Sequence, residues 1–373
     1  MLHLNTKGAA VQNNPHTTLV TADGPIANDT HGGRAKCLQR LVRLDLPVPR
    51  TVALSFDAVQ KIAEGHLPDV DAVVAQFPKE ALLCVRPSSQ DPDWGGPGAV
   101  LNIGINGARF DEFCQTMGEE PAAALYTRFV QTYAINVARL DPDMFDDVTG
   151  DGRAALEQSL WAYEQETEES FPQDPAKQLA GVLRSMARAW GGTSARLLRQ
   201  AKGAPADAGL GLVVQEMAFG VGTGQCGSGV LQLVDSDTGL PQIKGRYLSQ
   251  SQGRDALQGD SEALYLTKDP RGMSLEELVP DAFSELTQHA ALMRAKLREE
   301  MQVEFVVQDG ALHILDGVRV VRSSRAAVRI AVRLADDKII PREEALMRVE
   351  PRTLTELLHR QVDPRVKRDV IGR

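Results

Sequence analysis

The chain has 373 residues, of which 43% are hydrophobic and 24% are charged, and its formal net charge is −9 at neutral pH. The chain is longer than a chain that forms a single hydrophobic core usually is. Its composition is that of a folded protein rather than a fibrous or disordered one. The acidic balance argues against a general nucleic-acid or anionic-membrane partner. The four cysteines are widely spaced without a C-x-x-C pair, which argues against a disulfide framework or a zinc site.

The N-terminal residues contain no apolar stretch like that of a signal peptide, and no window approaches the roughly 18 apolar residues of a membrane span. We therefore expect a soluble, cytoplasmic protein with no membrane partner and no nucleic acid. Residues 1–30 are polar and are expected to form a loose segment with one strand near Thr18–Thr21.

The first clear helix is predicted to begin at Gly32-Gly33. Apolar residues of Arg34–Arg43 fall on one helical face, and the following Leu46-Pro-Val-Pro favours extended backbone. A strand over Arg50–Leu54 and a helix over Phe56–Gly65 are predicted next.

The segment Leu82–Asn106 carries the first functional signal. An apolar run ends in Arg86, a glycine-rich loop containing Gly95 and Gly96 follows, and the chain returns as a second apolar run, Val100–Ile105. A strand, a cation and a flexible loop can place backbone N–H groups and a positive charge over phosphates. The alternative is an ordinary turn rich in glycine and proline.

Residues 107–200 are helical in character, because they are rich in Ala, Leu, Arg and Glu and poor in β-branched runs. The predicted helices cover Gly107–Met117, Pro121–Leu140, Arg153–Gln165, Pro175–Trp190 and Thr193–Ala201. Residues 107–187 of this stretch are interpreted as a helical insertion.

The pattern changes to strands at Leu210. Predicted strands cover Leu210–Met217, Val230–Val234, Gln242–Leu248, Met301–Val307 and Leu312–Leu315, with helices over Met273–Glu277 and Ala282–Glu300. The chain is predicted to be helical again from Ser323 to Arg360. These elements indicate an α+β protein with mixed or antiparallel sheets.

Further pieces could form a nucleotide site together with Arg86. Gly32-Gly33-Arg34 offers a helix N-terminus and a cation to an anion, although it could be an ordinary glycine helix entry. Gly220–Gly229, which includes Gly227 and Gly229, could be a phosphate-covering flap or a long hairpin turn.

The run that precedes this loop could receive the base of the nucleotide. The backbone of Val213–Met217 could contact an adenine ring, with Gln215 and Met217 lining the pocket.

Two carboxylates stand in apolar strands, where a charge needs a partner or a metal ion. These are Glu304 and Asp316, and the turn at Gln308–Gly310 would bring both to one end of a hairpin. Two oxygen ligands and a triphosphate are a usual way of holding Mg²⁺. The alternative is a carboxylate neutralised by Arg319 or Arg322.

In this order the motifs resemble those of the ATP-binding part of the pyruvate phosphate dikinase and phosphoenolpyruvate synthase family, which has an ATP-grasp fold. The resemblance covers about residues 30–365. It is carried by Gly32-Gly33-Arg34 with Leu46-Pro-Val-Pro, Val85-Arg86 through Asn106, Phe171-Pro-Gln-Asp-Pro, Val214-Gln-Glu-Met with Phe219-Gly220, Gly227-Ser-Gly-Val and Val303-Glu304-Phe305.

The resemblance implies that ATP and Mg²⁺ bind between two lobes. Arg34 and Arg86 correspond to phosphate-binding residues, Gly95 to the phosphate loop, and Glu304 to a metal-side glutamate. It further implies an N-terminal lobe at 31–106 and 188–212, the insertion at 107–187, a C-terminal lobe at 213–322 and a helical linker at 323–373.

The chain also departs from the family. Arg34 replaces a lysine, Gln302 an aspartate and Asp316 a glutamine. Losing one such electrostatic contact typically costs on the order of 3 kcal/mol in a transition state. The family's phosphohistidine domain would begin beyond about residue 365, so we expect the acceptor to lie on a separate phosphohistidine-domain protein and the full dikinase reaction to be impossible for this chain alone.

Three functions stay open at this stage. The first is a Mg²⁺·ATP-binding phosphotransferase of the dikinase class, and the second is a catalytically degenerate nucleotide sensor or scaffold. The third is an unrelated small-molecule ligase with an ATP-grasp site. Whether the chain is an enzyme is therefore left undecided by its sequence.

Overall fold

The computed structural model describes residues 16–148, 152–252 and 263–358, and they form two compact units. Of the described residues, unit 1 contains 16–148, 152–228, 249–252 and 306–316, and unit 2 contains 229–248, 263–305 and 317–358. The predicted α+β class is confirmed, with two antiparallel sheets as in an ATP-grasp-like fold. Among the described residues, no helix is both long and apolar enough to cross a membrane.

Unit 1 is built on a five-stranded sheet in the order β1-β2-β5-β3-β4. Its strands are β1 (Thr17–Leu19), β2 (Thr51–Leu54), β3 (Leu83–Ser89), β4 (Val100–Ile103) and β5 (Leu210–Glu216). β5 pairs antiparallel with β2 on one side and with β3 on the other. Six of its seven residues are buried, as expected for a central strand with both faces covered.

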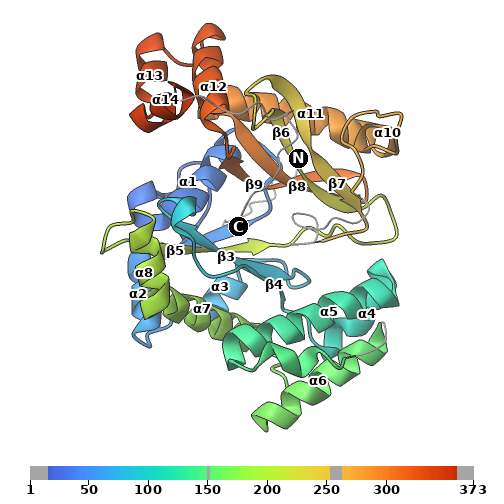
Figure 1. Ribbon diagram of the computed structural model, residues 1–373. Coiled ribbons are helices and arrows are strands. Elements are labelled where there is room, and N and C mark those ends of the chain that lie inside the picture. The colour runs from blue at the N-terminus through green and yellow to red at the C-terminus, as the bar shows by residue number, and fades with distance from the viewer. Residues whose placement is uncertain (1–15, 149–151, 253–262, 359–373) are drawn as a thin grey trace, which may run out of the picture. The chain divides into compact units, whose positions relative to one another are not determined.

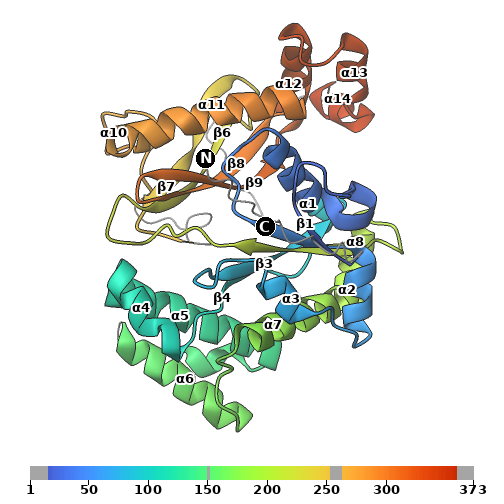
Figure 2. The same cartoon turned by 180° about the vertical axis from the view of Figure 1, so that it is seen from behind.

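Helices cover both faces of this sheet, as Figures 1 and 2 show from opposite sides. α1 (Asn28–Arg43) packs on β3 and β5 from one side. On the other side lie α2 (Phe56–Ala63), α3 (Val70–Val74) and α7 (Pro175–Gly191). Ser55 begins α2 by accepting a hydrogen bond from the Ala58 amide, which is the usual capping arrangement.

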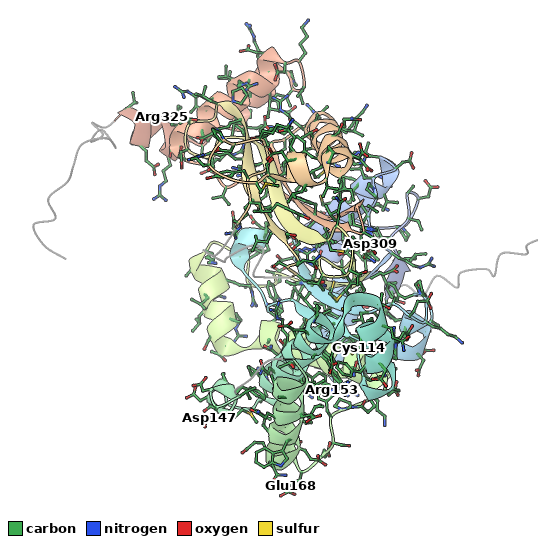
Figure 3. The ribbon with its side chains drawn as sticks, turned by 90° about the vertical axis from the view of Figure 1, so that its right-hand side faces the viewer. Cys114, Asp147, Arg153, Glu168, Asp309 and Arg325 are labelled. Atoms are coloured by element: carbon green, nitrogen blue, oxygen red, sulfur yellow. The ribbon has the colours of Figure 1, made fainter. Side chains whose placement is uncertain are left out.

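The helical part of unit 1 continues from β4. α4 (Gly107–Met117) packs against α5 (Glu119–Tyr133), and α5 packs against α6 (Arg153–Thr167). Figure 3 shows Cys114 of α4 and Arg153 of α6 in this layer, where Arg153 stacks over the Phe110 ring at 4.9 Å. Phe171 joins the layer to the core through edge-on contacts with four aromatic rings, those of Tyr126, Phe129, Tyr133 and Tyr163.

Unit 2 contains most of a four-stranded sheet in the order β7-β6-β8-β9. The strands are β6 (Gly227–Val234), β7 (Pro241–Ser249), β8 (Met301–Gln308) and β9 (Ala311–Arg319), and the helices α10 (Leu275–Leu278) and α11 (Pro280–Leu297) lie between β7 and β8 in sequence. α12 (Ser324–Asp336), α13 (Arg342–Met347) and α14 (Pro351–Leu358) follow, and α12 packs against both of the others.

Several sequence-based element assignments need correction. Gly227–Gly229 is not part of a loop, because it forms the start of β6 and is buried. The predicted helix Pro121–Leu140 ends as α5 at Tyr133 and continues as a π-helix, Ala134–Ala138. The short helix α3 was not predicted, and the helical segment from Ser323 consists of three separate helices within the described residues.

Candidate nucleotide site

The predicted helix entry at Gly32 is a sharp break within α1. Gly32 has φ 84°, and a β-carbon built on it would lie 1.8 Å from the Ser88 carbonyl oxygen. The Ser88 hydroxyl donates to the His31 carbonyl at 2.6 Å and accepts from the Ala35 amide at 3.0 Å. Glycine is therefore required at this position because β3 passes directly against the helix entry.

This break places Arg34 next to the last residues of β3. Its Nε donates to Asp316 Oδ2 at 2.6 Å, and its Nη1 donates to the Pro87 carbonyl. Arg86 approaches from β3, with Nη2 3.6 Å from the same Asp316 oxygen and Nη1 donating to the Leu315 carbonyl at 3.1 Å. Three residues that the sequence proposed for one site thus converge within unit 1.

Asp316 is the most deeply buried member of this cluster, with a side chain 1% exposed. Arg34 and Arg86 remain 21% and 12% exposed. A buried carboxylate is strongly unfavourable without compensating charge, and the two guanidinium groups supply it. Glu304 lies on β8 in unit 2, where it is half-buried.

The Gly95–Gly96 loop lies against the Arg86 strand. It follows a 3₁₀ turn, Pro92–Trp94, and Gly95 adopts φ 81°. A β-carbon built on Gly96 would lie 3.4 Å from the Pro87 side chain, so the loop packs directly beyond Arg86. A β-carbon built on Gly95 would lie 3.7 Å from the ammonium nitrogen of Lys202.

Lys202 was not found by sequence reasoning. It follows the C-terminus of α8 (Thr193–Ala201), more than a hundred residues from the loop in sequence, and it is exposed. Nothing in its local sequence distinguishes Lys202 from other surface lysines. It is the fold that brings this ammonium group, in addition to the arginines, close to the glycine loop.

The loop between β5 and β6, residues 217–226, is held by three glutamine side chains. The carbonyl oxygens of Gln308, Gln252 and Gln250 accept hydrogen bonds from the amides of Phe219, Gly220 and Gly222 at 2.8, 3.1 and 2.9 Å. Asp309, at the turn between β8 and β9 (Figure 3), lies beside Gly224, where a β-carbon would come within 2.4 Å of its carboxylate. The loop is therefore packed in place in this structure.

The two residues expected to line an adenine pocket are engaged within the sheet. Gln215 is 1% exposed and donates to the Thr51 hydroxyl at 3.1 Å. The Met217 sulfur accepts from the Asn102 amide at 3.0 Å, and the Met217 amide donates to the Leu82 carbonyl at 2.9 Å. These contacts fix the end of β5 beside β3 and β4.

His31 precedes the helix break and does not add a positive charge to the cluster. It is 5% exposed, and burial lowers the pKa of its imidazole, which favours the neutral ring. Its Nδ1 lies 2.8 Å from the Thr30 hydroxyl. The cations at this site are therefore the arginines and Lys202.

Within the described residues, no group of three or more histidine, cysteine, aspartate or glutamate side chains could hold a metal ion. The candidate metal ligands are only the two carboxylates Glu304 and Asp316. One or two carboxylates suit Mg²⁺ that completes its shell with water and phosphate oxygens. A single carboxylate such as Asp316 in unit 1 therefore fits a metal that arrives with a phosphate ligand better than a resident metal.

The α+β architecture with two antiparallel sheets is ATP-grasp-like, and the glycine loops and arginines are features of a nucleotide-binding protein. No family model matches the sequence. Pyruvate, phosphate dikinase of Rhizobium meliloti is 28% identical over 395 residues, covering 92% of this chain and 43% of the relative. The Clostridium symbiosum enzyme of the same name is 29% identical, covering 78% and 35%.

Pyruvate, phosphate dikinase 2 of Oryza sativa is 26% identical, covering 90% of this chain and 41% of the relative. The chain is thus related to the pyruvate, phosphate dikinases over most of its own length, which confirms the resemblance of its motifs. It spans less than half the length of these relatives. The relationship supports a nucleotide-binding module of a kinase family.

Proposed function

We propose that the chain is a Mg²⁺·ATP-binding phosphotransferase module that passes phosphate to an acceptor on another protein, such as a phosphohistidine domain. The observation that carries the proposal is the convergence of Arg34 and Arg86 on one point. Their guanidinium nitrogens lie 2.6 and 3.6 Å from a single carboxylate oxygen. Two cations fixed around one anion position suit a phosphate group.

The roles follow from the geometry of unit 1 and from the resemblance. Arg34 and Arg86 hold the phosphates, and the helix entry at Gly32-Gly33 adds backbone dipoles. The Gly95–Gly96 loop and the loop at residues 217–226, which leads into the β6 residues Gly227 and Gly229, cover them. Gln215 and Met217 position the strand that meets the base.

Glu304 and Asp316 are the proposed oxygen ligands of Mg²⁺. The ion would neutralise charge on the phosphates, which is its usual part in phosphoryl transfer. Positioning and electrostatic stabilisation carry most of such a reaction, so the protein needs fixed cations more than a covalent nucleophile.

The first experiment measures ATP binding by thermal shift and calorimetry in Mg²⁺. Saturation at about a hundred times Kd should add roughly 2.7 kcal/mol of stability, visible as a higher melting temperature. Arg86→Ala and Glu304→Ala should weaken binding. Arg325→Ala, an exposed arginine on α12 (Figure 3), is the control and should not. Absence of any shift for the unaltered protein at millimolar Mg²⁺·ATP would refute the proposal.

A second candidate is a nucleotide sensor or scaffold without catalysis. It is favoured by the ion pairing of both arginines with Asp316, which removes charge from the phosphate position. Radiolabelled ATP incubated with the protein and a separate phosphohistidine domain distinguishes the two. Labelled acceptor supports the phosphotransferase, whereas tight ATP binding without transfer supports the sensor.

A further inference from the structure

Asp316 occupies the position that an incoming anion would need. Its Oδ2 receives the Arg34 Nε hydrogen bond at 2.6 Å and lies 3.6 Å from Arg86 Nη2. The side chain is 1% exposed. Around a buried carboxylate, the Coulomb attraction of an arginine is screened less by water than it is at the surface. A phosphate that takes the nitrogens of Arg34 and Arg86 that face Asp316 has to displace this carboxylate.

The backbone supports of the two arginines do not depend on Asp316. Arg34 also donates to the Pro87 carbonyl, and Arg86 donates to the Leu315 carbonyl at 3.1 Å. These contacts use other guanidinium nitrogens than those that face Asp316. The arginines can therefore stay in place while the anion between them is exchanged.

In the loop between β5 and β6, residues 217–226, neutral groups already accept hydrogen bonds from backbone amides. Amides of Phe219, Gly220 and Gly222 point to glutamine carbonyls, at 2.8 to 3.1 Å. A carbonyl is a weaker acceptor than a phosphate oxygen, because charge roughly doubles the strength of a hydrogen bond. Phosphate would compete well for these amides, so the charged obstacle in the site is Asp316.

We propose that Asp316 is a built-in counter-anion that competes with phosphates for Arg34 and Arg86 and is released to a divalent cation when the nucleotide binds. This inference rests on the proposed nucleotide-binding function and names how the same site is regulated. The cation neutralises the carboxylate at the moment the arginines leave it. Mg²⁺ and ATP therefore bind with positive coupling through one side chain.

This coupling predicts that ATP affinity differs between conditions with and without a divalent cation. Without a divalent cation, ATP must draw both arginines away from the buried Asp316 carboxylate at a cost in free energy, and binding is weak. With the carboxylate made neutral, this obstacle disappears. Asp316→Asn keeps the size of the side chain and removes its charge, so it isolates the competition.

The experiment compares ATP affinity in EDTA and in Mg²⁺ by calorimetry. Asp316→Asn should bind metal-free ATP about tenfold more tightly than the unaltered protein, as for the loss of one charged competitor. Its gain in affinity on adding Mg²⁺ should shrink by a similar factor. Asp57→Asn makes the same chemical change at a carboxylate 62% exposed on α2 and should alter neither value.

A second variant and a second measurement keep the inference testable if Asp316→Asn does not fold. Asp316→Gln gives the same expectation if the asparagine variant is unfolded by circular dichroism. In the unaltered protein, the Arg34 Nε–H resonance, assigned with Arg34→Lys, should shift when Mg²⁺·ATP saturates the site. A resonance that stays unchanged at saturation overturns the inference.

The possible failures are distinguishable. If the unaltered protein binds no ATP in either condition, the proposed function fails and the inference fails with it. If it binds Mg²⁺·ATP but the neutral variants bind metal-free ATP no better, only the role of Asp316 is overturned. Binding of metal-free ATP as tight as that of Mg²⁺·ATP in the unaltered protein overturns it as well.

Discussion

The backbone conformation of Gly32 sets the direction of the chain at the helix entry and so the position of Arg34. Its φ of 84° is in the left-handed region, and the Ser88 carbonyl lies where a β-carbon would be. Ser88 bonds both sides of this break, to His31 and Ala35. The position of Arg34 therefore depends on a residue that has no side chain.

Gly32→Ala should destabilise the protein by more than about 2 kcal/mol, because a strained backbone angle is combined with a clash against β3. The measurement is the free energy of unfolding in urea. Gly203→Ala is the matched control, because Gly203 has the same φ of 84° but nothing within 4 Å of a built β-carbon. The Gly203→Ala protein should lose only about 1 kcal/mol of its free energy of unfolding. Equal losses would show that close approach to Ser88 has no energetic effect.

Sequence reasoning identified Arg34, Arg86 and Asp316 as members of one site but did not predict how they pair. The local alternative was neutralisation of Asp316 by Arg319 or Arg322. In the structure Arg322 pairs with Glu299 at 2.9 Å, and Asp316 contacts arginines that are distant in sequence. Spacing in the chain indicates residue types and neighbours, whereas such ion pairs depend on the fold. The proposed metal role of Asp316 stays a prediction.

At the scale of elements, the aromatic cluster around Phe171 is the best-defined piece of the helical part. Phe171 lies 5.3 Å from both Tyr133 and Tyr163, measured between ring centroids. Burial raises the pKa of the Tyr133 hydroxyl to about 12, and Tyr163 adds to the shift. The folded state thus keeps this phenol protonated where the unfolded chain would ionise it.

The pKa of Tyr133 leads to a pH dependence of stability. A raised folded-state pKa contributes stability that is fully present below about pH 10, the unfolded value, and is lost as the pH rises towards 12. At pH 11, one unit above the unfolded value, the loss should be about 1.4 kcal/mol, and it should approach 2 to 3 kcal/mol only above pH 12. Urea unfolding at pH 8 and pH 11 measures it.

Tyr133→Phe should remove much of this loss. Tyr265→Phe, in unit 2, retains Tyr133 and should preserve the loss. If the Tyr133→Phe protein weakens between pH 8 and pH 11 as much as the unaltered protein, the buried phenol is not responsible.

Helices were predicted best where capping residues and composition agree. Gly107–Met117 and Thr193–Ala201 have the predicted bounds, and Asn106 caps the first of them. The π-helix Ala134–Ala138 could not be predicted, because its sequence continues the helical pattern of α5. The start of β6 at Gly227 was assigned to a loop because glycine disfavours strands in isolation. Here Gly229 is needed because a β-carbon would meet the Arg246 carbonyl at 2.3 Å.

At the scale of the whole molecule, the two units alternate along the chain. Residues 249–255 and 306–316 return to unit 1 after the chain has entered unit 2. The second return supplies Asp316 and the amide of Ile314, which donates to the Pro47 carbonyl at 2.9 Å. The sequence-based domain boundaries, which cut the chain into consecutive blocks in this region, remain predictions and do not describe this alternation.

A fragment of residues 1–228 should therefore be less stable than unit 1 in the full chain. It keeps the five-stranded sheet but lacks Asp316, so the half-buried Arg34 and Arg86 lose this carboxylate. All three tryptophans, Trp94, Trp161 and Trp190, lie in this fragment, so their fluorescence reports on the same unit in both proteins. Denaturant midpoints should be lower for the fragment, and identical midpoints would contradict the expectation.

The late return of residues 306–316 also affects how the protein is made. During synthesis, domains generally fold as they emerge, N-terminal part first. Here the sheet that carries Arg86 is complete at Glu216, but its acidic partner leaves the ribosome a hundred residues later. For some seconds the nascent chain therefore lacks the Asp316 carboxylate that contacts Arg34 and Arg86 in the folded protein. On the proposed function, free nucleotide would meet no competition from Asp316 during that interval and would act as a folding ligand.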